Sequence, residues 1–269
     1  MLYTGINEID STLGELKNGE LTVVAGVYFA DPFFEYILYN LAKQADKNNR
    51  HNISNYDEKM QFIANYEDVK LEAPVEIISV LGTPRMEYNV LSNFPMNSYK
   101  QEEFDLLKKQ IVLFNNLPIQ QSFWFPSQRS AKLLIKDILN YYDHCIIPSK
   151  ISALCVSGWQ KQLPFLKEVA QTLNIPVIVF EYDTIESIAQ KFKSKMHYID
   201  KLVIIEDNYY KKEYSKLSNP ETTTFILKNL KTNQSSSITS NYHPQVFFEI
   251  YDKFYENQSE YTNCHDSQL

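Results

Sequence analysis

Short runs of apolar and β-branched residues recur along this chain and alternate with segments that carry apolar residues at helical spacing. The runs predict buried strands at residues 21–26, 75–81, 118–125, 151–156, 176–180 and 202–205. The segments between them predict helices over residues 33–46, 98–114 and 161–174, with a further helix capped by Ser127. This alternation predicts an α/β fold with a mostly parallel sheet covered by helices on both faces.

The remaining segments complete the predicted organisation. Residues 222–230 and 244–250 predict late strands at a mixed or antiparallel edge, and the polar residues 47–73 predict an insertion or long connection. We expect one domain over residues 1–255 and a polar, disordered tail at 256–269.

Composition excludes several classes of protein. With 44% hydrophobic and 22% charged residues, the chain can bury a core without disulfides or a structural metal. No apolar run reaches the roughly 18 to 20 residues of a membrane helix, and three cysteines without CxxC spacing predict a reducing, cytoplasmic compartment. The net charge of −7 argues against a surface that grips nucleic acid throughout, but it is compatible with a local basic face.

The most specific pattern lies in the first 26 residues. They read Thr4-Gly-Ile-Asn-Glu-Ile-Asp10, then Leu13-Gly-Glu-Leu16, then Asn18-Gly-Glu-Leu-Thr-Val-Val-Ala-Gly26. This opening resembles that of the RecA-like motor domain of DnaB-family replicative helicases, and RecA-like ATPases of the RadA and KaiC kind share part of it. Segments 117–125, 162–180 and 225–250 are similar to the DnaB family in order and spacing.

The resemblance implies a RecA-like, P-loop NTPase-type three-layer sandwich over most of residues 1–255. We expect no counterpart of the family's N-terminal helical domain and linker helix. Family rings place nucleotide between subunits and exchange that linker. The resemblance without the linker therefore predicts a monomer or weak oligomer instead of a homohexamer.

The phosphate-binding loop that such a motor needs is missing. Its glycines let backbone N–H groups approach the phosphates, its lysine neutralises their charge, and its hydroxyl holds Mg²⁺. Here residues 26–34 read Gly-Val-Tyr-Phe-Ala-Asp-Pro-Phe-Phe, and residues 27–42 contain neither glycine nor lysine. Asp31 would repel phosphate, so Gly26 and Asp31 are at most vestigial positions of the loop.

Aromatic residues occupy the region where the phosphates would lie, namely Tyr28, Phe29, Phe33 and Phe34. They either fill the former site or form an exposed patch for a partner, and burial is the favoured interpretation. Neither arrangement favours an anion.

Three further catalytic groups implied by the resemblance are absent. The metal-holding carboxylate should follow residues 151–156, where the chain has Ser157, and the general base should end the strand at 75–81, where it has Leu81 or Gly82. A trans-acting arginine would lie near residues 228–231, but Leu230 occupies the best-matching place and no arginine follows position 129. We therefore predict a motor fold with no catalytic residues and no cofactor, since a single such contact is worth on the order of 10³ to 10⁵ in rate.

A lysine-rich stretch leaves two interpretations open. Residues 191–231 hold nine lysines against five acidic residues, a balance of +4. The residues that could contact DNA phosphates are Lys211, Lys212, Lys228 and Lys231. A solvated face is the favoured alternative, because lysine is common on surface helices.

Other aromatic and sulfur-containing residues favour ordinary packing. Trp124, with Phe123 and Phe125, could stack on single strands but fits a core strand better, while Trp159 could equally fill the space of a nucleotide. His144 with Cys145, and His243 with Cys264, lack the spacing of metal ligands, so no metal is predicted.

The function we predict is therefore that of a DnaB-type motor-domain homologue without ATP hydrolysis. It would bind a replicative helicase, a loader protein or DNA, in replication or in a mobile element, with no membrane partner. Two alternatives remain open: a divergent active ATPase or helicase that uses ATP and Mg²⁺, and an inhibitory subunit that inserts into a partner's ring.

Overall fold

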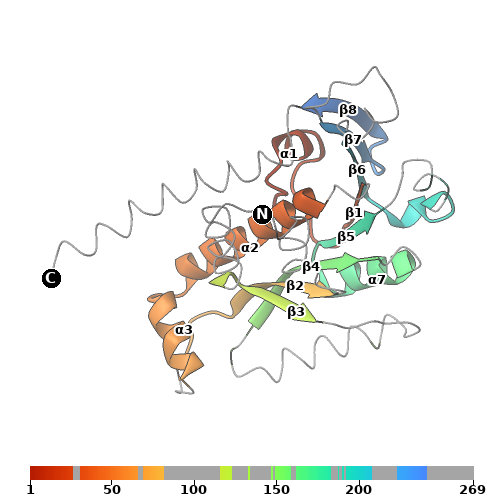
Figure 1. The fold of residues 1–269 in the computed structure, drawn as a ribbon. Helices are drawn as coiled ribbons and strands as arrows, with labels where there is room; N and C mark the ends of the chain where they lie inside the picture. Colours follow the sequence, from red (N-terminus) through yellow and green to blue (C-terminus); the bar gives the residue numbers. More distant parts are fainter. Residues whose placement is uncertain are drawn as a thin grey trace, which may run out of the picture.

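A single eight-stranded sheet forms the centre of the molecule (Figure 1). The computed structural model describes residues 1–26, 31–65, 69–81, 116–122, 149–158, 162–182, 192–207 and 223–240, with Leu133, Ile147, Ser187 and Gln190. The strand order is β3-β2-β4-β5-β1-β6-β7-β8. The strands are β1 (Leu21–Gly26), β2 (Val75–Leu81), β3 (Ile119–Ser122), β4 (Ser149–Ser157), β5 (Val177–Tyr182), β6 (Lys201–Asp207), β7 (Thr223–Asn229) and β8 (Gln234–Ser240).

Strand direction matches the prediction from sequence. The six strands from β3 to β6 in this order are parallel, whereas β7 and β8 pair antiparallel at the edge next to β6. This arrangement confirms the α/β class and the expected antiparallel edge.

Helices cover both faces of the sheet (Figure 1). On one face, α1 (Asn7–Leu13) and α2 (Asp31–Asn52) bury their apolar side chains against alternate residues of the strands, including Val24. On the other face, α7 (Leu163–Leu173) packs with Val23 and its neighbours. Because successive strand residues point to opposite faces, the fully buried β1 contributes to both cores. The result is the three-layer sandwich that the sequence predicts.

The polar segment 47–73, predicted as an insertion or long connection, contains helical residues that the sequence did not indicate. Helix α2 continues to Asn52, and α3 (Tyr56–Ala64) follows it. The polar composition concealed this, because the contacts that stabilise the helix come from β2: Asn49 is buried and bonds the backbone of Glu76, and Ile53 packs on Val75.

Strand β8 was also missed, because its sequence QSSSITS has only one apolar side chain. Its backbone pairs with all seven residues of β7, and Ile238 packs on the core. The short 3₁₀ helix η3 (Met196–Tyr198) precedes β6. The predicted helices over 98–114 and after Ser127, the strand at 244–250 and the tail at 256–269 lie outside the described residues, Leu133 excepted.

Candidate functional site

The six parallel strands end at one edge of the sheet, here called the carboxyl edge. In open α/β sheets, ligands bind at this edge. The central strands β1, β5 and β4 end there at Gly26, Tyr182 and Ser157. This is where a RecA-like motor would hold nucleotide, and the vestigial positions predicted for the phosphate loop and the metal carboxylate lie here.

The start of α2 gives the first test of that site. A phosphate loop has two glycines five positions apart, the second followed at once by lysine and then serine or threonine at the helix N-terminus. Counted from Gly26 at the end of β1, these three places fall at Asp31, Pro32 and Phe33, where α2 begins. Proline has no N–H to donate, and none of the three supplies a cation or a hydroxyl.

Aromatic packing fills the first turn of α2. Phe33 is fully buried and meets the ring of Phe225 edge-on at 5.6 Å. Phe34 is buried between two rings of β5, with centroids 4.8 Å from Phe180 and 5.1 Å from Tyr182. Burial, the favoured interpretation from sequence, is confirmed for Phe33 and Phe34. Tyr28 and Phe29 lie outside the described residues.

The places of the metal carboxylate and the general base are occupied by uncharged residues. Ser157 ends β4 half-exposed, and the N–H of Gly158 donates to the carbonyl of Phe180 at 3.1 Å. Leu81 ends β2 buried, in register with the buried Val156. Gly82 lies outside the described residues.

One buried carboxylate near this edge has no signal in the sequence. Glu181 of β5 is buried next to Ala25 of β1 in the parallel register. The alternation of β5 places it on the α7 side, opposite Phe34. The strand run was predicted to stop at Phe180, so nothing in the sequence marked Glu181 as buried. Glu181 adds a carboxylate to this edge, and none of the residues that the structure describes there supplies a phosphate cradle or a cation for a magnesium nucleotide.

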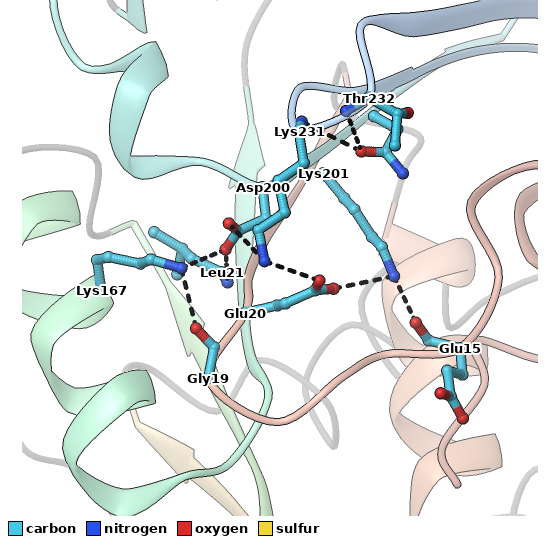
Figure 2. A network of polar contacts seen from close by, with 10 residues as sticks. Glu15, Gly19, Glu20, Leu21, Lys167, Asp200, Lys201, Lys231 and Thr232 are labelled. Atoms are coloured by element: carbon cyan, nitrogen blue, oxygen red, sulfur yellow. Dashed lines mark hydrogen bonds and ion pairs between the residues drawn. The ribbon is translucent and has the colours of Figure 1, made fainter.

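The predicted basic stretch contributes a buried ion-pair network at the opposite, amino edge of the sheet (Figure 2). Lys201 belongs to the stretch for which a solvated face was the favoured interpretation, but its side chain is buried. Its ammonium lies 3.1 Å from Glu20 Oε2 and donates to the carbonyl of Glu15. Lys231 lies 3.0 Å from Glu20 Oε1 and 3.3 Å from Asp200 Oδ1. The sequence does not indicate this network, because its partners lie far apart in the chain. Lys231 and Glu20, for example, are separated by 211 positions.

The contacts of Lys231 favour the protonated, charged form of its side chain. Burial by itself would lower its pKa, but the hydrogen bond to Glu20 and the charges of Asp200 and Glu20 raise the pKa above its ordinary value. Lys231 is therefore charged and engaged within its own chain. Leu230 packs against the α7-side core, Lys228 is half-buried in β7, and Lys211 and Lys212 lie outside the described residues.

The residues that carry the opening pattern have structural roles. The Asp10 carboxylate accepts hydrogen bonds from the N–H and hydroxyl of Thr4 and from the N–H of Gly5, at 2.8–2.9 Å. Gly5 has φ +82°, and a Cβ there would lie 2.4 Å from Asn40. Asp10 of α1 therefore fixes the loop that precedes it, and the close approach of Gly5 to Asn40 places that loop against α2.

Other candidate sites find no support among the described residues. Within those ranges, no group of three or more His, Cys, Asp or Glu could hold a metal ion. No helix of the described part of the chain is long and apolar enough to cross a membrane. The residues Trp124 with its neighbours Phe123 and Phe125, Trp159, His144, Cys145, His243 and Cys264 all lie outside the described residues.

Comparison with known proteins agrees with the fold. No protein-family profile and no curated protein sequence matches the chain. Among solved structures, the ATPase domain of a DnaB-like helicase superposes with a TM-score of 0.61 at 9% identity, covering 88% of this chain and 86% of that one. A DnaB-like replicative helicase, studied with its interactions with primase, superposes with a TM-score of 0.59 at 10% identity, covering 88% of this chain and 58% of that one.

At such low identity the likeness establishes the fold. The chain has the RecA-like α/β fold of DnaB-like helicase ATPase domains, as the opening residues predicted.

Proposed function

We propose that this chain is a DnaB-type motor-domain relative that has lost ATP hydrolysis and acts by binding, as a regulatory protein in DNA replication or in a mobile element. The partner we propose is a replicative helicase or its loader, and DNA is the second ligand to test. We expect no nucleotide cofactor, a cytoplasmic location, and a monomer or weak oligomer.

The observation that carries this proposal is the packing of Phe34 between Phe180 and Tyr182. In a P-loop protein the first turn of this helix turns its N–H groups toward phosphate. Here that turn directs aromatic rings into the core, and the sequence places Asp31 and Pro32 ahead of them. A ligand with three or four negative charges gains nothing from such a surface.

The division between retained and lost residues supports the same proposal. Thr4, Gly5 and Asp10 match the helicase opening and stabilise the N-terminal segment. The positions that would touch phosphate or metal carry Asp31, Phe33 and Ser157 instead. Residues that maintain shape are kept and residues that perform chemistry are changed, which is the pattern expected of a domain that works through its surface.

Calorimetric titration with a non-hydrolysable ATP analogue, with and without Mg²⁺, tests the loss of nucleotide binding. We expect no heat of binding at millimolar analogue, and a working DnaB-type helicase under the same conditions serves as the positive control. Magnesium-dependent binding that weakens in Ser157→Ala, a half-exposed position at the carboxyl edge, would favour the alternative of a divergent active ATPase.

A separate experiment tests the regulatory role. The purified chain is added to an intact replicative helicase, and co-migration is measured by light scattering together with ATP turnover of the helicase. We expect complex formation with a changed turnover. Absence of complex formation with both helicase and loader, combined with salt-dependent DNA binding, would instead identify a lone DNA-binding module.

A further inference from the structure

Two buried carboxylates at the amino edge share three lysines from three different parts of the chain (Figure 2). The side chains of Glu20 and Asp200 are 8% and 7% exposed. Lys167 of α7 lies 2.6 Å from Asp200 Oδ2, and that oxygen also accepts the N–H of Leu21 at 2.6 Å. Lys201 forms an ion pair with Glu20 Oε2 at 3.1 Å.

Lys231 differs from the other two lysines in position and in exposure. It bridges the remaining oxygens, Glu20 Oε1 and Asp200 Oδ1, and so joins the two carboxylates to each other. Its side chain is 53% exposed, whereas those of Lys167 and Lys201 are 15% and 4% exposed. The network therefore contains two pairs shielded from solvent and one bridge that water and ions can reach.

The turn that carries Lys231 is built independently of this bridge. The side-chain amide oxygen of Asn229 accepts hydrogen bonds from the backbone N–H groups of Lys231 and Thr232, both at 3.2 Å. Asn233 completes the turn in the left-handed conformation, with φ +56°. The conformation of the turn that carries Lys231 is therefore set by the turn's own hydrogen bonds. The backbone N–H of Leu230, just before Lys231, donates to the carbonyl of Asp200 at 2.8 Å.

The strand after this turn contributes little apolar burial. Among its residues only Ile238 packs on the core, and Ser240 donates to Glu8 at 2.6 Å near the strand's end. An element with few buried apolar contacts opens more easily than the core. Strand β8 therefore depends on its ladder with β7 and on polar contacts at its two ends.

We propose that Lys231 is an ionic latch, which holds the turn between β7 and β8 on the amino edge and releases it locally when its charge is screened or removed. Salt screens an exposed ion pair strongly and a buried pair much less. Release therefore leaves the Lys167–Asp200 and Lys201–Glu20 pairs in place, so the domain stays folded. The released edge presents the carboxylate oxygens Glu20 Oε1 and Asp200 Oδ1 to solvent, which makes it more acidic.

Hydrogen exchange measured by mass spectrometry tests the latch on the full chain. In Lys231→Met, which keeps most of the aliphatic stem, we expect peptides covering 230–240 to exchange roughly tenfold faster, because half-buried ion pairs fall between exposed and buried ones in strength. Peptides of α1 and α2 should exchange at the wild-type rate. Lys228→Met is the matched control, since Lys228 lies in the adjoining strand and outside the network, and it should leave residues 230–240 unchanged.

A salt series on the wild-type protein gives a second test that needs no variant. Raising the salt from 0.05 to about 1 M, where the screening length falls from more than 10 Å to about 3 Å, should accelerate exchange in 230–240 and have no such effect in Lys231→Met. Unchanged exchange in Lys231→Met would overturn the latch. A rise in the exchange rate of Lys231→Met that extends equally to α2 would also overturn it. The same holds if exchange of residues 230–240 in the wild-type protein does not respond to salt.

Discussion

The ring of Phe34 lies 4.8 Å from the ring of Phe180 and is tilted by 31° to it, which joins the first turn of α2 to the adjacent end of β5. Tyr182 contacts the same ring from the end of the strand at 5.1 Å. A motor domain keeps this turn polar, because its helix N-terminus must receive phosphate. Here the same turn contributes to the hydrophobic core and therefore to stability.

Replacing Phe34 measures that contribution. Phe34→Ala should lower the free energy of unfolding by about 3–5 kcal/mol, since it removes a buried ring and leaves a cavity. Phe62→Ala is the control, because Phe62 is a large aromatic side chain that is 48% exposed, and it should change stability by less than about 1 kcal/mol. Urea denaturation measures both. Equal, small effects would show that Phe34 does not pack as described.

Gly5 tests the structural role of the opening residues. Gly5→Ala forces φ +82° on a residue with a Cβ and places that Cβ 2.4 Å from the side chain of Asn40. The backbone strain alone costs about 1–3 kcal/mol, and the contact with Asn40 adds to it. Gly19→Ala has a similar φ of +75° but open space around the Cβ, so it isolates the strain. We expect Gly5→Ala to unfold at clearly lower denaturant than Gly19→Ala, and equal midpoints would contradict the close contact.

How far the sequence predicts the fold depends on where each element gets its stability. Strands β1 and β5 carry β-branched apolar runs, and this local signal is enough. Strand β8 and the end of α2 are polar, and they are held by backbone pairing and by buried amides that no local pattern records.

The same distinction applies to the candidate site. The loss of the phosphate loop can be predicted because it depends on which residue types stand between Gly26 and Phe34. The burial of Lys201 cannot be predicted, because its carboxylate partner Glu20, which comes just before β1, lies far away in the chain. A lysine count treats every lysine as solvated, whereas burial depends on whether the fold brings a counter-charge within reach.

Asn49 tests how the polar end of α2 is attached to the sheet. Its side-chain amide donates to the carbonyl of Glu76 at 2.9 Å and accepts the N–H of Glu76 at 2.7 Å. Asn49→Ala leaves both backbone groups without these partners and should cost about 2–4 kcal/mol. Asn52→Ala, at an exposed position of the same helix, should cost less than about 1 kcal/mol. A small effect of Asn49→Ala in urea denaturation would mean that water replaces the amide without penalty.

Glu72 gives a pH-dependent test of the contact between α3 and the segment before β2. Hydrogen bonds from Lys59 at 2.5 Å and Ser54 at 2.7 Å lower the pKa of Glu72 to about 2, from 4.5. Because the folded pKa is depressed, the stabilisation from this carboxylate is present above pH 4.5 and is lost as the pH falls toward 2. An NMR titration of the side-chain carboxyl should give a pKa well below 4.5 in the wild type and a pKa close to 4.5 in Lys59→Met. Lys47→Met, which removes an exposed lysine from α2, should leave the titration unchanged. A wild-type midpoint near 4.5 would show that Lys59 and Glu72 do not pair in solution.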